Sequence, residues 1–324
     1  MINNIIFMGT PRFAVPSLLI LIKNNLKPVL CVTQPDKLQG RNRHLDYSPI
    51  KKIALENNLP IYQPEDINSY ESIVFLQAYH PDILITVGYG ALLNSKLRSM
   101  CPFGAINLHP SLLPLHRGAD PIRSTLINGE QDCGNTIFFI NGKMDAGPII
   151  SQRKYRINSL LFQINFTNLE NILADRGAQD LMDVILLLGK NELRFKALKT
   201  SFSPQNHLLA TYSTKFEKHS SLADFRLTAD KFIRLVVGFA LEPGYYCYYR
   251  GKRLKIFLAE IFSRQQNIDL GVIKSIIKNQ GFIISVPDAD LLIKEVQYEG
   301  KKIMNAWDFC HGVRMKIGEY LSMN

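Results

Sequence analysis

In the stretch Ile5-Ile6-Phe7-Met8-Gly9-Thr10-Pro11, the first four residues form a continuous apolar run, which Gly9-Thr10-Pro11 ends. Such a run predicts a buried β-strand. A helix-like stretch from about residue 13 to residue 23 follows it, and Pro28–Thr33 is a second apolar run. Strand, helix and strand at this spacing predict a parallel sheet that helices cover on both faces.

The same alternation of strands and helices continues to residue 87. Ligands bind such sheets at the carboxyl ends of the strands, where Gly9, Gly88 and the segment 107–111 all fall. No GxGxxG pattern follows the first strand, so dinucleotide binding is not indicated. The further elements are two helices and two strands, over Pro49–Asn57, Tyr70–Ala78, Ile61–Tyr62 and Asp82–Val87.

A hairpin is predicted between residues 135 and 152, with Asn141-Gly142 as its tight turn. Its strands include Thr136–Ile140 and Pro148–Ile150. Asp145 lies just past the turn, where a loop side chain can point into a cleft. The pattern over Thr167–Gly189 is that of a long amphipathic helix, which we expect to cover the sheet.

The chain changes character between Lys199 and Ser213, where Ser, Pro, Gln and Asn gather without a clear period. This composition predicts a linker, which we place over residues 201–213 between domains over 1–200 and 214–324. Beyond the linker, a helix and several β-like runs predict a small all-β barrel. These elements are Leu227–Phe239, then Tyr245–Tyr249, Leu254–Ala259, Gly271–Ile277, Phe282–Val286 and Leu291–Val296.

Net charge, cysteine content and hydropathy indicate what kind of protein this is. The net charge of +10 over 324 residues fits a polyanionic partner such as RNA, and a generally basic surface is the alternative explanation. The five cysteines form no CxxC pair, so a zinc ribbon or redox motif is not indicated and buried thiols in a reducing compartment are expected. Neither a secretory signal nor an apolar run of membrane-spanning length is present, so we expect a cytoplasmic protein.

Three polar residues form the candidate catalytic group: Asn107, His109 and, beyond the predicted turn, Asp145. Asn107 and His109 are two positions apart, so both side chains project from one face of an extended segment. An amide can stabilise a developing oxyanion, an imidazole can move a proton, and a carboxylate can orient the imidazole. The set is not a zinc pattern, so we expect no metal. Each residue alone is ordinary in a loop or turn, and the combination carries the interpretation.

The motif Asn-x-His-x-Ser-Leu-Leu-Pro over residues 107–114, with Arg117-Gly118 and Asp145-Ala-Gly-Pro, resembles the formyltransferases that use 10-formyltetrahydrofolate. Within that family the chain is most similar to the methionyl-tRNA formyltransferases. This similarity extends to segments well outside the motif. They are Phe7–Pro11, Thr33–Asp36, Leu59–Pro64 and Ala210–Tyr212.

The resemblance implies a Rossmann-like parallel-sheet domain followed by a small β-barrel of the oligonucleotide-binding (OB) type that binds tRNA. It implies transfer of a formyl group from 10-formyltetrahydrofolate to the α-amine of methionyl initiator tRNA by a monomer. Asn107, His109 and Asp145 would be catalytic, with the order of proton transfer between the last two left open. The residues that the resemblance places against the folate are Tyr89, Gly90, Leu92, Ser111, Leu112, Leu113, Pro114 and Asn141.

The basic loop from Lys37 to Lys52 resembles the element that enters the tRNA acceptor stem. Lys37, Arg41 and Arg43 are its candidate tRNA-binding residues, since cationic side chains suit phosphate contacts. A solvated charged loop is the alternative.

Two departures from the family pattern leave the acceptor open. Asp120 stands where the family usually has alanine, and Glu242-Pro243-Gly244 replaces the usual start of the C-terminal domain. The alternatives are a formyltransferase for a nucleotide-linked amino sugar, a formylfolate hydrolase, and a non-catalytic RNA-binding protein.

Overall fold

The computed structural model describes residues 2–39, 44–157, 164–190, 202–240 and 242–323. The chain divides into two compact units, and each unit combines segments that are far apart in the sequence. The first unit consists of Met1–Pro121, Asp132–Arg156 and Glu170–Thr214, and the second of Ile122–Gln131, Ile157–Leu169 and Lys215–Asn324.

A seven-stranded sheet forms the centre of the first unit, in the order β10-β9-β7-β6-β1-β2-β5. Five of its strands are parallel, and β9 and β10 run antiparallel at one edge. The parallel strands are β1 (Ile5–Gly9), β2 (Leu30–Val32), β5 (Ile61–Tyr62), β6 (Ile83–Val87) and β7 (Ala105–His109), and the antiparallel pair is β9 (Asp132–Phe139) and β10 (Ile149–Arg156).

Helices bury both faces of this sheet, and every residue of β1 and β6 is buried. Ser48 and Ser69 cap the amino ends of α2 and α3 by accepting a backbone N–H, which ends the preceding loop. Gly177 lets α6 approach Leu108 closely, because a Cβ there would lie 3.0 Å from that side chain. The helices are α1 (Val15–Lys23), α2 (Pro49–Glu56), α3 (Tyr70–Gln77), α4 (Ser95–Ser99) and α6 (Phe166–Lys190).

The second unit is built on an antiparallel sheet in the order β12-β13-β16-β15-β14, with β17 on β16. The C-terminal tail closes this sheet, since Ser322 bridges to Tyr248 on one edge and Tyr320 bridges to Val272 on the other. The elements are α5 (Pro121–Asn128), α8 (Ala229–Gly238), β12 (Tyr245–Tyr249), β13 (Lys252–Arg264), β14 (Ile273–Ile277), β15 (Gly281–Val286), β16 (Ala289–Tyr298), β17 (Met304–Asn305) and α9 (Ala306–Val313).

These two architectures confirm the expected Rossmann-like domain and antiparallel β domain. The prediction of a tight turn at Asn141-Gly142 is wrong, because the longer loop 140–148 joins β9 and β10. In this loop Gly147 lies against the carbonyl of Phe139, where a side chain would have no room. In the expected linker, the described residues 202–213 belong to the first unit, where β11 (Tyr212–Ser213) pairs with β8 (Arg117–Gly118).

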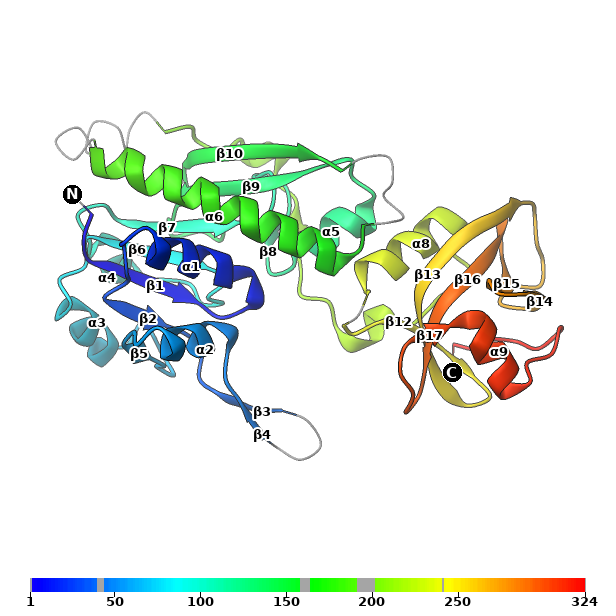
Figure 1. Ribbon diagram of the computed structural model, residues 1–324. Coiled ribbons are helices and arrows are strands. Elements are labelled where there is room, and N and C mark those ends of the chain that lie inside the picture. The colour runs from blue at the N-terminus through cyan, green and yellow to red at the C-terminus, as the bar shows by residue number, and fades with distance from the viewer. Residues whose placement is uncertain (1, 40–43, 158–163, 191–201, 241, 324) are drawn as a thin grey trace. The chain divides into compact units, whose positions relative to one another are not determined.

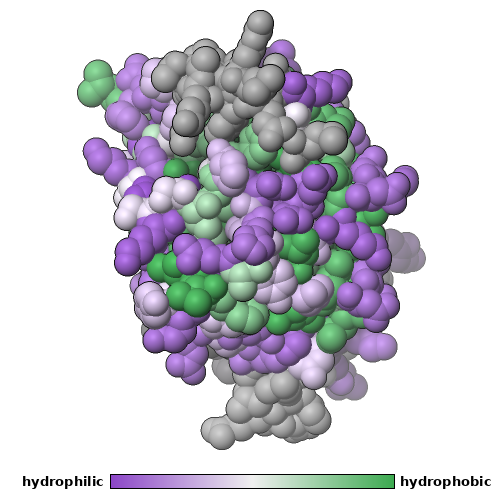
Figure 2. Space-filling view, turned by 90° about the vertical axis from the view of Figure 1, so that its left-hand side faces the viewer, coloured by the Kyte–Doolittle hydropathy of each residue, from purple (hydrophilic) through white to green (hydrophobic). Residues whose placement is uncertain are grey.

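The described residues also bear on the composition-based expectations. All five cysteines are free and buried. No helix in the described part of the chain is long and apolar enough to cross a membrane, and no cluster of His, Cys, Asp and Glu there could hold a metal ion. Figure 2 shows one face of the molecule, on which hydrophobic residues lie in separate patches among hydrophilic ones.

Candidate active site

Strand β7 carries the first two candidate residues. It lies between β6 and β9, with Asn107 opposite Thr86 on one side and opposite Phe138 on the other. Asn107 and His109 are both inside the strand and two residues apart, so their side chains leave the same face. His109 is buried, and Asn107 is half-buried.

The ring of His109 is held from both sides. Its Nε2 lies 2.9 Å from the carbonyl oxygen of His116. Because a carbonyl only accepts, Nε2 carries the hydrogen, and Nδ1 is left to take or release a proton. Nδ1 lies 3.7 Å from Oδ2 of Asp145.

His116 and Asp145 both adopt the left-handed backbone conformation that L-residues rarely occupy, with φ of 57° and 48°. The N–H of His116 donates to Oγ1 of Thr211 at 2.8 Å. Oδ2 of Asp145 accepts the N–H of Gly118 at 2.8 Å. Strained backbone of this kind persists where surrounding contacts hold it, and it is common at functional sites.

The side-chain amide of Asn107 has no protein partner in the described structure. Its Oδ1 is buried without a hydrogen bond, and its Nδ2 donates to none of the described residues. Buried polar atoms are normally hydrogen-bonded, so the unpartnered Oδ1 of Asn107 is an exception among the described residues. The structure brings Nδ1 of His109 and Oδ2 of Asp145 to 3.7 Å and places Asn107 on the same face of β7 as His109.

The composition of this cluster suits acyl transfer, and comparison with known proteins identifies the family. A formyl transferase model matches residues 3–185, and a formyl transferase C-terminal domain model matches residues 215–314. The chain belongs to the formyl transferase family.

Named relatives cover this formyltransferase almost completely. Methionyl-tRNA formyltransferase of Clostridium tetani is 34% identical over 316 residues, which is 97% of this chain and 98% of the relative. The same-named protein of Fusobacterium nucleatum is 34% identical and covers 98% of this chain and 99% of its own.

Solved structures share the fold at low identity. HypX from Aquifex aeolicus, in complex with tetrahydrofolic acid, has a TM-score of 0.60 and 15% sequence identity to this chain. The matched region covers 98% of this chain and 48% of the HypX chain. An N-formyltransferase from Helicobacter canadensis, in complex with folinic acid and dTDP-3-aminofucose, has a TM-score of 0.60 and 17% sequence identity to this chain. The matched region covers 92% of this chain and 100% of that chain.

The residues expected to contact folate fall in three places on the formyltransferase domain. Tyr89, Gly90 and Leu92 follow β6; Tyr89 is buried, while Leu92 is 59% exposed. Asn141 follows β9, and its Oδ1 accepts the N–H of Lys143 at 2.9 Å. The neighbouring Ile140 N–H donates to Ala105, so Asn141 lies near the amino end of β7 rather than its carboxyl end.

The third group, Ser111 to Pro114, is a rigid corner directly after β7. Oγ of Ser111 donates to the carbonyl of Leu115 at 2.6 Å, and the buried Leu113 donates its N–H to Thr136. Leu112 and Pro114 are half-buried. A corner fixed by its own hydrogen bonds can present an apolar edge to a flat ligand without rearranging.

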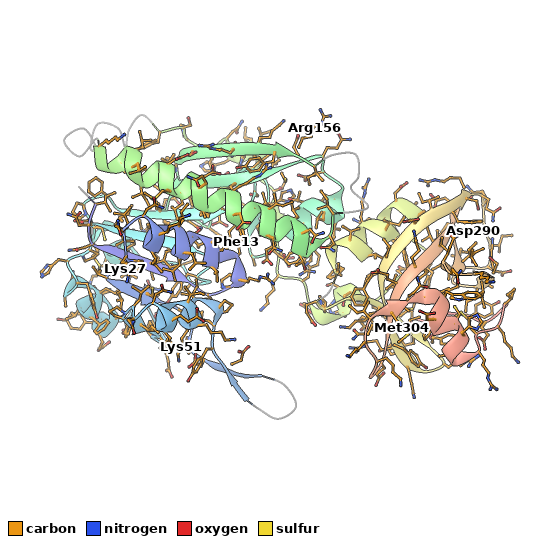
Figure 3. The ribbon with its side chains drawn as sticks, viewed as in Figure 1. Phe13, Lys27, Lys51, Arg156, Asp290 and Met304 are labelled. Carbon is orange, nitrogen blue, oxygen red and sulfur yellow. The ribbon has the colours of Figure 1, made fainter. Side chains whose placement is uncertain are left out.

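The basic loop forms a hairpin from β3 (Lys37–Gln39) and β4 (His44–Asp46). Arg41 and Arg43 lie outside the described residues, and only the backbone of Lys37 is described. At the base of the hairpin, Lys51 forms an ion pair with Asp36 (Figure 3 labels Lys51 at α2). Oδ1 of Asp36 also accepts from Gln63 at 2.9 Å, so this base is firmly attached.

The two departures from the family pattern lie outside the catalytic cluster. The backbone N–H of Asp120 contacts Oγ of Ser213 at 3.3 Å. Gly244, with φ of 85°, donates its N–H to the carbonyl of Phe239 and closes the turn after α8.

Sequence reasoning missed two residues that support the cluster, His116 and Gln205. His116 contributes its carbonyl rather than its ring, and a backbone contribution leaves no signal in residue type. Gln205 sits in the segment expected to be a linker, and no local pattern connects it to Asp145.

Proposed function

We propose that this formyltransferase moves a formyl group from 10-formyltetrahydrofolate to the α-amine of methionyl initiator tRNA. The observation that carries the proposal is the His109 ring between the His116 carbonyl and the Asp145 carboxylate, with Asn107 on the same face of β7. The full-length similarity to proteins named methionyl-tRNA formyltransferase supports the choice of acceptor.

Each residue of the cluster has one task. The attacking amine forms a bond to the formyl carbon, and the carbonyl oxygen takes negative charge. Nδ2 of Asn107, which has no described protein partner, donates to that oxygen. Nδ1 of His109 takes the proton that the amine must lose.

Asp145 stabilises the imidazolium that results. The proton then leaves on the folate nitrogen as the bond between that nitrogen and the formyl carbon breaks, so atoms and charge balance over the cycle. The side chain of Asp145 is 14% exposed, and shielding from water strengthens its interaction with the charged ring. The donor supplies the activated formyl group, and the chain supplies position, a hydrogen bond and a proton path.

For folate contacts, we propose the corner Ser111 to Pro114 and the backbone from Tyr89 to Leu92. Asn141, which the resemblance also suggests, lies near the opposite end of β7 and is not part of this proposal. The corner directly follows His109, so a flat ring bound there places its substituents beside the cluster. Apolar side chains with a few backbone groups are typical of sites for planar heterocycles.

For tRNA, we propose contacts from Lys37, Arg41 and Arg43 and from the C-terminal domain. In that domain β12 alternates, with Tyr245 buried and its neighbours Tyr246 and Tyr248 half-buried on the outer face. The guanidinium of Arg253 lies 4.4 Å from the ring centre of Tyr246. Mixed aromatic and cationic side chains suit a nucleic-acid surface.

We further propose the functional division that the sequence predicts: residues 1–200 for catalysis, 201–213 as the connection, and 214–324 for tRNA binding. We propose that the protein acts as a monomer and in the cytoplasm; the second proposal follows because initiator tRNA is used where translation takes place.

Single-turnover formylation of charged initiator tRNA tests the proposal. Wild-type protein should transfer the formyl group, and Asn107→Ala and His109→Ala should be severely impaired. A nucleotide-linked amino sugar in place of the tRNA is the competing acceptor. Formylation of the sugar without formylation of the tRNA would overturn the assignment and favour the alternative.

A further inference from the structure

Gln205 connects the two loops that meet at His109, although it lies in a segment with the composition of a linker. Its side chain is 6% exposed. Its Nε2 donates to the carbonyl oxygens of Asp145 at 2.9 Å and Gly147 at 2.8 Å. Its Oε1 accepts from Arg117, from Nε at 3.2 Å and Nη2 at 2.7 Å. The two donors and two acceptor positions of the amide are therefore all used.

The two loops that Gln205 joins lie on opposite sides of the His109 ring. The loop 140–148 carries Asp145, which faces Nδ1. The segment that contains Arg117 also contains His116, whose carbonyl binds Nε2, and Gly118, whose N–H binds the Asp145 carboxylate. One buried amide thus bonds to both segments that carry the partners of the ring.

The conformation of the Asp145 loop requires such support. Asp145 has a φ of 48°, which costs energy for a non-glycine residue. A Cβ on Gly147 would lie 1.6 Å from the Phe139 carbonyl oxygen, so the loop is pressed tightly onto β9. Beside Gln205, the carbonyl of Ser203 accepts the N–H of Ile149 at 2.9 Å, which fastens the end of the same loop.

We propose that Gln205 is a positioning residue that holds the Asp145 carboxylate at His109 during formyl transfer. This inference rests on the proposed function of the cluster. A displacement of about 1 Å at a catalytic group, caused by a mutation away from the reacting atoms, can lower activity by about 100-fold. Because Gln205 acts through Asp145, its effect should vanish when the carboxylate is absent.

The test combines two Gln205 variants with a matched control. Gln205→Ala removes the whole amide. Gln205→Glu has the same shape and keeps an oxygen for Arg117 but loses both donors to the loop. Asn206→Ala is the control, since Asn206 is the next residue, is exposed, and its side chain accepts the N–H of Leu208 in the turn 207–209.

Both Gln205 variants should lower kcat for methionyl-tRNA by up to about 100-fold, with KM for folate and tRNA within about threefold of wild type. Asn206→Ala should behave as wild type. In the Asp145→Asn background, Gln205→Ala should cause no further loss, because both changes remove one interaction.

Three results would overturn the proposal. Wild-type turnover in Gln205→Glu would assign the effect to Arg117 alone. A full additional loss in the double variant would place the role of Gln205 elsewhere. Failure of both variants to fold would make Gln205 a residue of general stability.

Amide hydrogen exchange separates this inference from the proposed function. The N–H of Gly118 donates to Asp145, so its exchange should speed up in Gln205→Ala and remain slow in Asn206→Ala. If wild-type protein forms no formyl-methionyl-tRNA, the proposed function fails while this measurement still decides whether Gln205 holds the loop. Unchanged Gly118 exchange in Gln205→Ala would refute the positioning role.

Discussion

Nε2 of His109 lies 2.9 Å from the backbone carbonyl oxygen of His116, and this contact leaves Nδ1 as the ring nitrogen that can take or release a proton. The carbonyl accepts a hydrogen from Nε2 in both the neutral and the charged ring. Proton exchange is therefore confined to Nδ1, the nitrogen that faces Asp145. The strained backbone of His116, with φ of 57°, is part of this arrangement.

Replacing His109 by alanine should lower single-turnover formylation by about 10²-fold to 10⁴-fold, because the proton acceptor for the amine is lost. Folate binding should change little, since the proposed folate contacts lie on neighbouring segments. Rapid-quench kinetics and equilibrium folate titration measure the two quantities. Retained turnover in this variant would contradict the assigned role.

Replacing Asn107 tests the oxyanion donor. Asn107→Ala should reduce kcat by about 10²-fold to 10³-fold, the usual effect of removing one such donor. The isosteric Asn107→Asp should be at least as impaired, because a carboxylate cannot donate and repels the developing charge. Equal activity of Asn107→Asp and wild type, measured under single-turnover conditions, would remove Asn107 from the mechanism.

Replacing two glycines by alanine should change the stability of the protein in opposite directions. Gly118 has φ of 115°, and a Cβ there would lie 2.3 Å from the Ser213 carbonyl oxygen. Gly118→Ala should therefore destabilise the protein by about 1–3 kcal/mol. Gly312 lies in α9, and a Cβ added there would meet no described atom within 4 Å, so Gly312→Ala should stabilise by about 0.5–1 kcal/mol. Urea unfolding measures both, and matching signs would contradict the argument.

Acid should weaken the closure of the C-terminal barrel. Hydrogen bonds from Tyr249, the Lys316 N–H and Arg250 lower the pKa of Glu319 from 4.5 to about 2. A lowered folded-state pKa means that the stabilisation is complete above about pH 4.5 and is lost as the pH falls from 4.5 towards 2. Glu319→Gln should therefore melt below wild type at pH 7, and the gap in Tm should shrink below pH 4.5. A gap independent of pH would show that the ionised carboxylate contributes nothing.

Removing two charges from the basic hairpin should weaken tRNA binding selectively. Arg41→Ala with Arg43→Ala should reduce the slope of log affinity against log salt by roughly 0.7–0.9 per lost phosphate contact, and folate binding should not change. The charge-matched control is Lys23→Ala with Lys27→Ala. These exposed lysines lie where α1 ends and β2 begins, at the amino ends of the strands and away from the site (Figure 3 labels Lys27). Equal losses in both pairs would indicate a non-specific charge effect.

Local sequence patterns predicted the regular elements closely. The run Asp82–Val87 became β6 (Ile83–Val87), and the amphipathic stretch Thr167–Gly189 became α6 (Phe166–Lys190). Hydrophobic period and bounding turn residues specify such elements through short-range sterics and burial. The prediction of a tight turn at Asn141-Gly142 failed. These residue types permit a turn but do not require one, and the chain continues to Gly147 before it packs against Phe139.

The segment from 201 to 213 shows what amino-acid composition cannot predict. Polar residues without a period fit a linker, yet the described residues pair with β8 and reach the Asp145 loop. Gln205 and Asp145 are 60 residues apart, and nothing in either neighbourhood encodes their contact. The contact forms because the amide of Gln205 is buried, and each of its polar atoms finds a hydrogen-bond partner in backbone or side-chain groups that are distant in the sequence.

By itself the sequence determined the alternating α/β layout, the antiparallel C-terminal domain and the three polar groups of the site, because period, turn chemistry and motif spacing are local properties. The tertiary structure decided which nitrogen of His109 faces Asp145, how Asp145 is held in a strained conformation, and that Gln205 joins the two loops around them. Those features depend on distances between backbone groups that are far apart along the chain, and such distances are fixed only when the sheet and its loops pack together.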